Sequence, residues 1–246
     1  MPVRLPPDIA ACLLDMDGVL TRTAEVHAAA WKEMFDEFLR SHAARTGAPF
    51  VPFDAVDDYD RYVDGRPRED GTREFLRSRG IELPEGDPAD PPGADTVAGL
   101  SNRKNDLVLA RIRSQGVKPY PGSVRFVEEA RRAGLGTAVV SSSANTAEVL
   151  DSAGLSHLVD ERVDGLVAAR EHLAGKPAPD TYLAAARRLG VDPGHAAVFE
   201  DALAGVEAGR AGRFGLVVGV DRVGQAAALA AHGADVVVAD LDELIG

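Results

Sequence analysis

Short, continuously apolar runs alternate with helical patterns through most of the chain. These runs cover residues 9–14, 136–140, 196–199, 214–220 and 234–239. Apolar segments of this length, without polar alternation, are typical of parallel strands that are buried on both faces. Their alternation with helices predicts an α/β fold, a doubly wound parallel sheet whose ligands bind beyond the carboxyl ends of the strands.

The residues at which two helices of this sheet domain begin and end can be predicted from the sequence. Ser123 is expected to open a helix that stops near Gly134, and Asp180 is expected to open one that stops before Gly190. Serine and aspartate cap helix N-termini, and glycine commonly follows helix C-termini.

Residues 22–116 follow a different pattern, because their apolar residues take helical spacing. We expect helices near residues 23–41, 68–79 and 101–115, and a loop at residues 84–93, which are rich in proline, aspartate and glycine. We interpret residues 22–116 as an α-helical cap domain. It is inserted into a discontinuous catalytic core of residues 1–21 and 117–246.

Charge and cysteine content exclude several classes of protein. The 246 residues include 39 acidic and 27 basic side chains, a net charge of -12, which argues against nucleic acid or an anionic membrane as a partner. Cys12 is the only cysteine, so neither an intrachain disulfide nor a four-cysteine zinc site can form.

No uncharged apolar stretch approaches the roughly 20 residues that span a bilayer, and the N-terminal residues lack a signal-peptide pattern. We therefore expect a cytoplasmic protein.

An acidic pair follows the first apolar run. Asp15 and Asp17 are two residues apart, so in extended backbone both side chains leave on one side, and Gly18 permits a sharp turn. A divalent cation would relieve their repulsion, leaving one carboxylate to attack phosphorus and the other to carry a proton. An ordinary acidic turn is the alternative interpretation.

A second acidic pair, Glu200 and Asp201, follows the run at residues 196–199. Carboxylate oxygens are hard ligands that suit Mg²⁺, which needs few of them because it keeps several waters. Taken alone, this pair could also be the N-cap of the next helix.

Polar residues of two further segments could bind a phosphate group. Ser141, Ser142, Ser143 and Asn145 follow the run at residues 136–140, where hydroxyl and backbone N–H groups at a helix start can hold phosphate. Lys176 precedes a proline-rich loop and could neutralise a transferring phosphoryl group. Ordinary helix caps and an exposed lysine are the alternatives.

In their order and contexts, these motifs resemble those of the haloacid dehalogenase superfamily. The matching residues are Asp15-Met16-Asp17-Gly18-Val19-Leu20-Thr21, Ser141, Lys176 and Glu200-Asp201. The resemblance implies a Rossmann-like core in which Asp15 is phosphorylated and Asp17 is the general acid and base. It also implies that Ser141 and Lys176 bind phosphoryl oxygens. One Mg²⁺ per active site would be held by Asp15, Asp17, Glu200 and Asp201.

The cap segment resembles that of the β-phosphoglucomutase branch of this superfamily. The shared positions are Thr23, Glu25, His27, Trp31, Gly65, Arg68, Glu69, Asp70, Arg103, Lys104, Asn105 and Asp106. The resemblance implies that Arg68 grips the non-transferring phosphate and that Lys104 reaches the site from the cap. His27 and Thr23 would position the acid/base. The other expected substrate-binding residues are Trp31, Gly65, Ser142, Ser143 and Asn145.

Simpler roles are open for three of the cap residues. Lys104 could be a solvated helix charge, Trp31 a core residue, and His27 the partner in a local hydrogen bond. The sequence also departs from the mutase pattern at two positions. Ala144 stands where a lysine commonly follows the serine motif, and Asp64 stands where a lysine often precedes the glycine.

The resemblance implies a mutase that interconverts β-D-glucose 1-phosphate and glucose 6-phosphate, with β-glucose 1,6-bisphosphate as intermediate and activator. A Mg²⁺-dependent sugar-phosphate phosphatase would use the same core motifs and is the first alternative. A sugar-phosphate sensor without turnover is the second. We expect the partner to be a small phosphosugar and the protein to be a monomer, with a homodimer as the alternative.

Overall fold

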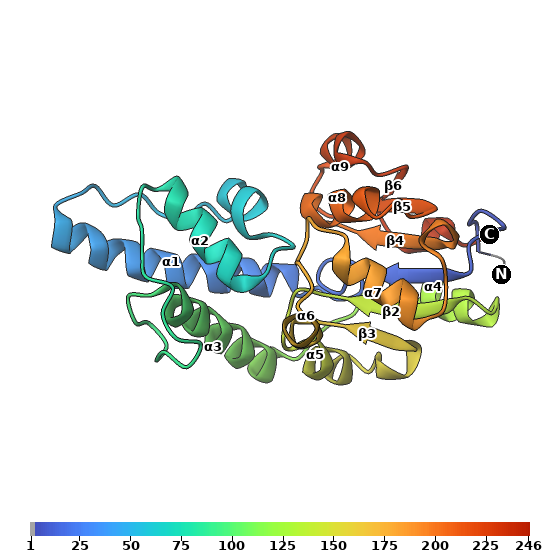
Figure 1. Cartoon of the computed structure of the whole chain (residues 1–246), viewed down its shortest axis with the longest axis horizontal. Helices are drawn as coiled ribbons and strands as arrows, with labels where there is room; N and C mark the ends of the chain where they lie inside the picture. The colour runs from blue at the N-terminus through green and yellow to red at the C-terminus, as the bar shows by residue number, and fades with distance from the viewer. Residues whose placement is uncertain (1–2) are drawn as a thin grey trace. The chain divides into compact units, whose positions relative to one another are not determined.

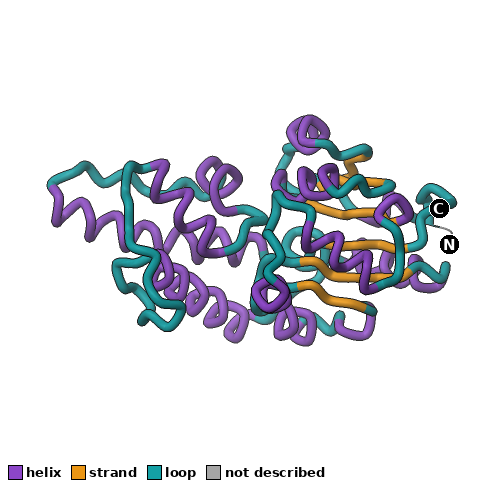
Figure 2. Tube along the Cα trace, in the orientation of Figure 1, coloured by secondary structure: helices purple, strands orange, loops and turns teal. Residues whose placement is uncertain are grey.

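The computed structural model describes residues 3–246 and divides into two compact units (Figure 1). The first, here called the α/β unit, contains the described chain up to Arg22 and from Val117 to Gly246. The second, the helical unit, is Thr23–Gly116. In Figure 2, every strand of the described residues lies in the α/β unit. The predicted fold class, a doubly wound α/β core with an inserted helical segment, is confirmed.

Residues 3–246 contain one six-stranded parallel sheet in the order β3-β2-β1-β4-β5-β6. Its strands are β1 (Ala11–Leu14), β2 (Gly136–Val140), β3 (Glu161–Val163), β4 (Ala196–Glu200), β5 (Leu216–Val220) and β6 (Val236–Val238). The first strand lies centrally, and the chain builds the sheet outward on one side before it crosses to the other. Strand order reverses beside β1, where sheets of this type bind ligands.

Apolar side chains cover both faces of the sheet. Leu13 of β1 packs in one buried cluster with Tyr182 and Val206 from two helices. Leu14, the next residue, points to the opposite face, where it lines a small pocket together with Val127. Burial on both faces explains why the central strand β1 is apolar throughout.

The helices of the α/β unit connect these strands. They are α4 (Pro121–Arg132), α5 (Thr146–Ser152), α6 (Gly165–Glu171), α7 (Asp180–Arg188), α8 (Leu203–Ala211) and α9 (Ala226–His232). Short 3-10 turns occur at η2 (Ser156–Leu158), η3 (Pro193–His195) and η4 (Leu241–Leu244). In Figure 1, α7 crosses in front of the sheet.

One of the two predicted helix starts in this unit is wrong in detail. Ser123 lies inside α4, which begins at Pro121, and its buried hydroxyl donates to the carbonyl of Val19 at 2.7 Å. Proline, whose missing N–H costs nothing in a first helical turn, starts this helix instead. The other predicted start is confirmed, because Asp180 is the first residue of α7, with Pro179 at the N-cap position.

The helical unit is held together by an aromatic core. Its helices are α1 (Ala24–Thr46), the π-helical turn η1 (Tyr59–Val63), α2 (Arg68–Ser78) and α3 (Val97–Gln115). Phe35 lies at the centre, with ring centroids 5.2 Å from Trp31, 5.2 Å from Phe53 and 4.1 Å from Phe75. Such rings bury large apolar areas and fix the packing of α1 on its neighbours.

The ends of these helices differ from the predicted ones for local reasons. Helix α3 begins four residues before the predicted start at residue 101, because the hydroxyl of Thr96 accepts the N–H of Gly99 at 2.9 Å and caps it. Helix α1 continues past residue 41 to Thr46, and Gly47 ends it with a positive φ of 75°. Within residues 3–246, each helix is too short or too polar to cross a bilayer.

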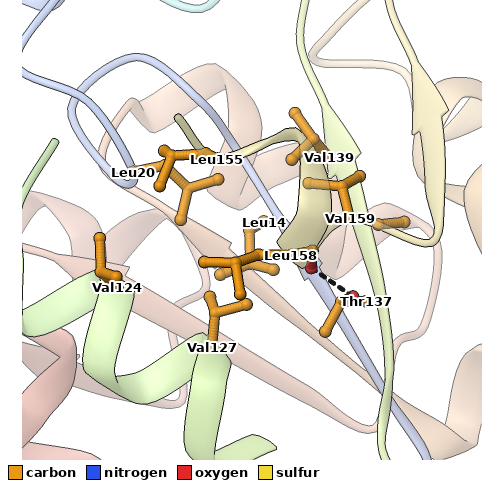
Figure 3. A pocket seen from close by; sticks show the side chains of 10 residues that line it. Leu14, Leu20, Val124, Val127, Thr137, Val139, Leu155, Leu158 and Val159 are labelled. Atoms are coloured by element: carbon orange, nitrogen blue, oxygen red, sulfur yellow. Dashed lines mark hydrogen bonds between the residues drawn. The ribbon is translucent and has the colours of Figure 1, made fainter. Parts of the chain in front are cut away.

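A small apolar pocket lies between α4 and the sheet (Figure 3). The centre of a water molecule can reach only about 10 Å³ of it, and a stable water would also need two or more polar partners. The hydroxyl of Thr137, one of the lining residues, already donates to the carbonyl of Leu158 at 2.8 Å (Figure 3). The pocket is therefore a packing defect rather than a binding site.

Filling this defect should stabilise the protein. Val127→Ile adds one methylene next to the pocket and is expected to raise the free energy of unfolding by about 0.8 kcal/mol. The same change at Val198, which is fully buried in the middle of β4, should cost about 1–3 kcal/mol by overpacking. Urea unfolding of both variants measures the difference. Equal destabilisation by the two changes would show that the pocket has no spare volume.

Candidate active site

Carboxylates of two neighbouring strands meet at the centre of the sheet edge. Asp15 directly follows β1, and Glu200 ends β4, whose register pairs Leu14 with Phe199. The N–H of Asp15 continues the ladder by donating to the carbonyl of Phe199 at 3.0 Å. With Asp201, the next residue, these buried side chains bring three carboxylate oxygens within 4.8 Å of one another.

Lys176 supplies a buried positive charge to this cluster. Its Nζ donates to Asp15 Oδ1 at 2.5 Å and to the carbonyl of Val140 at 3.2 Å, and it forms an ion pair with Glu200 Oε1. Only 1% of its side chain is exposed, so the alternative interpretation as an exposed lysine is wrong. The loop between α6 and α7 carries it to the sheet edge and includes a cis peptide bond to Pro177.

Glu200 is held by several donors in addition to Lys176. The hydroxyl of Tyr182 on α7 donates to Oε1 at 2.7 Å, and the N–H of Ala202 donates to Oε2 at 3.3 Å. A side chain at Gly205 would overlap this carboxylate, since a Cβ there would lie 1.9 Å from its Cδ. Glu200 is therefore fixed by hydrogen bonds and by contact with the backbone of α8.

No sequence motif marks Tyr182 as a site residue, because it occupies one of the apolar positions expected of a helix. A buried tyrosine hydroxyl nevertheless needs a partner, and an acidic residue at a strand end is a natural candidate. That general rule is the one signal that could have linked Tyr182 to the site.

The charges in the cluster shift each other's protonation. Burial raises the pKa of Asp15 well above its usual value; Lys176 opposes the rise, while the charges of Glu200 and Asp17 add to it. Burial alone would lower the pKa of Lys176, but the carboxylates of Asp15 and Glu200 raise it above its ordinary range. The lysine is therefore cationic, and Asp15 needs additional positive charge to be a fully ionised nucleophile.

The three clustered carboxylates suit a hard divalent cation. Asp15, Glu200 and Asp201 offer oxygen ligands only, as Mg²⁺ prefers, and their mutual repulsion would be relieved by its charge. Lys176 balances only part of the acidic charge. The carboxylate of Asp17 is not one of the three grouped here, so its expected part in metal binding stays a prediction.

The loop after Asp15 is tightly folded. The carbonyl of Met16 accepts the N–H of Leu20 at 3.0 Å, and both the N–H and the hydroxyl of Thr21 at 2.9 and 3.1 Å. Gly18 has a φ of 86°, and a Cβ there would lie 1.7 Å from Asp201 Oδ2. Only glycine fits in this turn, because the backbone of residue 18 lies directly against Asp201. The loop that carries Asp17 is therefore close to the carboxylate cluster.

The serine motif follows β2 at the same edge of the sheet. Ser141 is buried, and its N–H donates to the carbonyl of Val163 at 3.0 Å. Its Oγ accepts the N–H of Ser143 at 3.1 Å, and the Oγ of Ser143 accepts the N–H of Asn145 at 3.1 Å. These bonds form a compact turn before α5, in which Ser142 is partly exposed.

Three of the predicted cap residues lie together inside the helical unit. The Nζ of Lys104 on α3 lies 3.0 Å from His27 Nδ1 and 4.7 Å from the ring centroid of Trp31, both on α1. Lys104 is 5% exposed, so the alternative of a solvated helix charge is wrong. Trp31 packs in the core of the helical unit, as its alternative states. The contact of His27 reaches Lys104, 77 residues away in sequence, so it is not a local one.

The remaining cap residues occupy helix starts and a turn. Thr23 is buried immediately before α1, and Gly65 adopts a φ of 68° in the turn before α2. Arg68, the first residue of α2, pairs with Glu69 at 3.0 Å and is partly exposed. The roles predicted for these three residues stay predictions.

Sequence comparison relates most of the chain to known proteins. A model of the haloacid dehalogenase-like hydrolase family matches residues 9–213. A beta-phosphoglucomutase of Mycobacterium tuberculosis is 58% identical over 244 residues, which make up 98% of this chain and 93% of that protein.

Solved structures resemble the chain over both units. A beta-phosphoglucomutase of Clostridium difficile superposes with a TM-score of 0.75 over 96% of this chain and 93% of that one, at 23% identity, which concerns the fold alone. A variant of CbbY from Rhodobacter sphaeroides, crystallised with xylulose-(1,5)-bisphosphate, gives a TM-score of 0.69 at 25% identity over 97% of both chains.

The raised pKa of Asp15 predicts a pH-dependent gain in stability on Mg²⁺ binding. Without Mg²⁺, the folded state binds the Asp15 proton more tightly than the unfolded state. The protonated Asp15 therefore contributes its full stabilisation below pH 3.8, and this stabilisation is lost as the pH rises through the raised pKa of the folded state. Mg²⁺ and the proton compete for the carboxylate. Thermal unfolding with Mg²⁺ and with EDTA should therefore show a gain in midpoint that grows with pH.

Asp201→Asn should reduce that gain at every pH, because it removes one charged ligand from the cluster. A gain that does not change with pH, or that survives intact in Asp201→Asn, would argue against a cation at these carboxylates.

Tyr182→Phe should destabilise the protein, because buried Glu200 loses a hydrogen-bond donor while the ring stays. We expect a loss of about 1–3 kcal/mol in the free energy of unfolding, measured by urea unfolding. Tyr62→Phe, at a partly exposed ring of the helical unit, is the matched control and should have a smaller effect. Equal losses would mean that the hydroxyl of Tyr182 contributes nothing specific to Glu200.

Proposed function

Because the chain belongs to the haloacid dehalogenase-like hydrolase family, we propose that it is a β-phosphoglucomutase, which interconverts β-D-glucose 1-phosphate and glucose 6-phosphate. The observation that carries the proposal is the 58% identity to a beta-phosphoglucomutase over 98% of the chain, the helical unit included. The buried cluster of Asp15, Lys176, Glu200 and Asp201 supports it, because phosphoryl transfer needs a nucleophile beside positive charge, which Lys176 and a divalent cation at these carboxylates would supply.

In the proposed cycle, phosphorylated Asp15 transfers its phosphoryl group to the C6 hydroxyl of β-glucose 1-phosphate, and Asp17 accepts the hydroxyl proton. The product, β-glucose 1,6-bisphosphate, turns over within the site. A carboxylate oxygen of Asp15 then attacks the C1 phosphorus, the bond from phosphorus to the C1 oxygen breaks, and Asp17 returns the proton to that oxygen. Glucose 6-phosphate leaves, and Asp15 is phosphorylated again. Free bisphosphate would activate the resting enzyme by phosphorylating Asp15.

Positive charge at the transferring group would come from two sources. When bound, one Mg²⁺ held by Asp15, Glu200 and Asp201, with Asp17 as a further ligand, would polarise the phosphoryl oxygens. Lys176 would offset the remaining charge, and Ser141 would hold a phosphoryl oxygen through its hydroxyl. Because Lys176 is already fixed between Asp15 and Glu200, it needs no rearrangement to do so.

We propose that residues 22–116 form the cap that binds the rest of the substrate and excludes water. Arg68 suits the non-transferring phosphate because a guanidinium binds phosphate oxygens in pairs. Lys104, oriented by His27 and Trp31, suits a second anionic contact. Thr23, Gly65, Ser142, Ser143 and Asn145 would complete the substrate site. The protein would act on this small phosphosugar as a cytoplasmic monomer.

A sugar-phosphate phosphatase is the second candidate. Ala144 and Asp64 stand where mutases of this branch commonly carry lysines, which removes two positive charges that would hold a substrate phosphate. A phosphatase would use the same Asp15 and Asp17 but would let water discharge the phosphoenzyme.

One assay separates the two candidates. β-Glucose 1-phosphate is supplied with Mg²⁺ and a trace of β-glucose 1,6-bisphosphate, and both glucose 6-phosphate and free phosphate are followed. A mutase forms glucose 6-phosphate with little phosphate. Release of phosphate without isomerised product would make the protein a phosphatase.

Asp15→Asn and Asp17→Asn should affect different steps. Asp15→Asn should abolish turnover and the acid-stable phosphoenzyme, because no nucleophile remains. Asp17→Asn should lower kcat by about 10²–10⁴-fold, the usual contribution of acid–base catalysis, while Asp15 still becomes labelled by acetyl phosphate. Turnover by a folded Asp15→Asn variant would rule out the proposed function.

A further inference from the structure

The arginine after β5 is bonded to the loop that carries Asp17. Arg222 Nε donates to the carbonyl of Gly18 at 2.8 Å, and Nη2 donates to the carbonyl of Val19 at 3.4 Å. Nη2 also donates to the hydroxyl of Ser123 at 3.3 Å, the same hydroxyl that bonds Val19. The side chain is 13% exposed. Its guanidinium therefore holds two consecutive carbonyl oxygens directly after Asp17.

The opposite edge of the guanidinium is fixed to the C-terminal segment. Nη1 donates to the carbonyl of Ala239 at 2.8 Å and to Asp240 Oδ2 at 3.2 Å. An arginine bonded on both sides of its planar fork has little freedom to move, so it can act as a rigid support for the Gly18 carbonyl.

The face of the same guanidinium lies on the ring of Tyr120. Its central carbon is 3.6 Å from the ring centroid, and that of Arg22 is 5.0 Å from the same centroid. Tyr120 is part of the returning chain segment, where its N–H donates to the carbonyl of Leu20 at 2.9 Å. Arg222 thus contacts the Asp17 loop and the ring of Tyr120, in the segment that returns from the helical unit.

The loop of Arg222 is itself rigid and also reaches the second acidic pair. Oxygens of the Asp221 carboxylate accept the backbone N–H groups of the four residues 223–226. The side chain of Gln225 donates to the carbonyl of Asp201 at 2.9 Å. One ordered loop after β5 is therefore bonded to the backbone of both loops that carry acidic site residues.

We propose that Arg222 is a positioning residue for phosphoryl transfer, which holds the Gly18–Val19 backbone so that Asp17 keeps its place beside Asp15. The inference rests on the proposed role of Asp17 as acid and base. Arginine suits this task because its fork bonds several oxygens in one plane while its face stacks on an aromatic ring, which the ammonium of lysine cannot do.

The test compares Arg222→Ala with a structural arginine of the same unit. Arg131 also donates to a carbonyl, a hydroxyl and a carboxylate, those of Leu158, Thr137 and Asp160, but at the beginning of β2, away from the acidic loops. Arg222→Ala loses five such bonds and Arg131→Ala loses three, and thermal unfolding measures each loss so that kcat is compared at the same folded fraction. Steady-state kinetics of the mutase assay and labelling of Asp15 by acetyl phosphate measure function.

Arg222→Ala should lower kcat by about 10²-fold, the lower end of what acid–base catalysis contributes, while KM changes much less. Asp15 should still be labelled, because acetate is a good leaving group and needs little protonation by Asp17. Millimolar guanidinium should restore part of the lost kcat, and Arg222→Lys should keep less activity than the wild type. Arg131→Ala should keep its kcat at temperatures where it is folded.

Wild-type kcat in Arg222→Ala, or a kcat that falls no further than in Arg131→Ala at the same folded fraction, would overturn the inference. Equal loss of kcat and labelling would also overturn it, since the whole site would then have collapsed. If the alanine variant does not fold, Arg222→Lys and Arg222→Gln decide by the same criteria. Full activity in Asp17→Asn would instead refute the proposed function, independently of Arg222.

Discussion

The contact between Lys176 and two buried carboxylates determines how the rest of the site can be arranged. Parallel pairing of β1 and β4 brings Asp15 and Glu200 to the same edge, where both are removed from water. Burying such charges is costly unless they are paired and hydrogen bonded. Lys176 provides that pairing, since its ammonium contacts both carboxylates at once. With Asp201 added, the cluster still has more negative than positive charge, which is the condition for holding a divalent cation.

The residues around this cluster hold its carboxylates and the loops that carry them in place. Gly18 and Gly205 let two chain segments approach carboxylates more closely than any side chain would allow. Tyr182 and the N–H of Ala202 orient Glu200, and the loop of Arg222 holds the backbone beyond Asp17. Precise placement of a reacting group depends on such supports, because small displacements lower the rate of a positioned reaction.

Much of the fold and of the candidate site could be predicted from the sequence, for one physical reason. A strand that is buried on both faces must be apolar, so an acidic pair after it stands out, and parallel strands bring such pairs to one edge. This reasoning located Asp15 and Glu200. It missed β3, because a three-residue strand with Glu161 and Arg162 has no apolar pattern.

Other features depend on contacts that are distant in sequence. The burial of Lys176 comes from bonds to Asp15 and Val140, far along the chain, whereas an isolated lysine is usually exposed. Ser123 resembles a helix cap, but its hydroxyl bonds Val19, 104 residues away in sequence. Arg222 belongs to no local motif at all.

The choice between mutase and phosphatase also cannot be made from the core motifs, because the carboxylates and Lys176 serve both reactions equally. What differs is whether water reaches the phosphoenzyme and whether a second phosphate can be held, and both depend on residues outside the core motifs. The identity of 58% is informative for this reason, since it extends through the helical unit and not only through the residues that carry the chemistry.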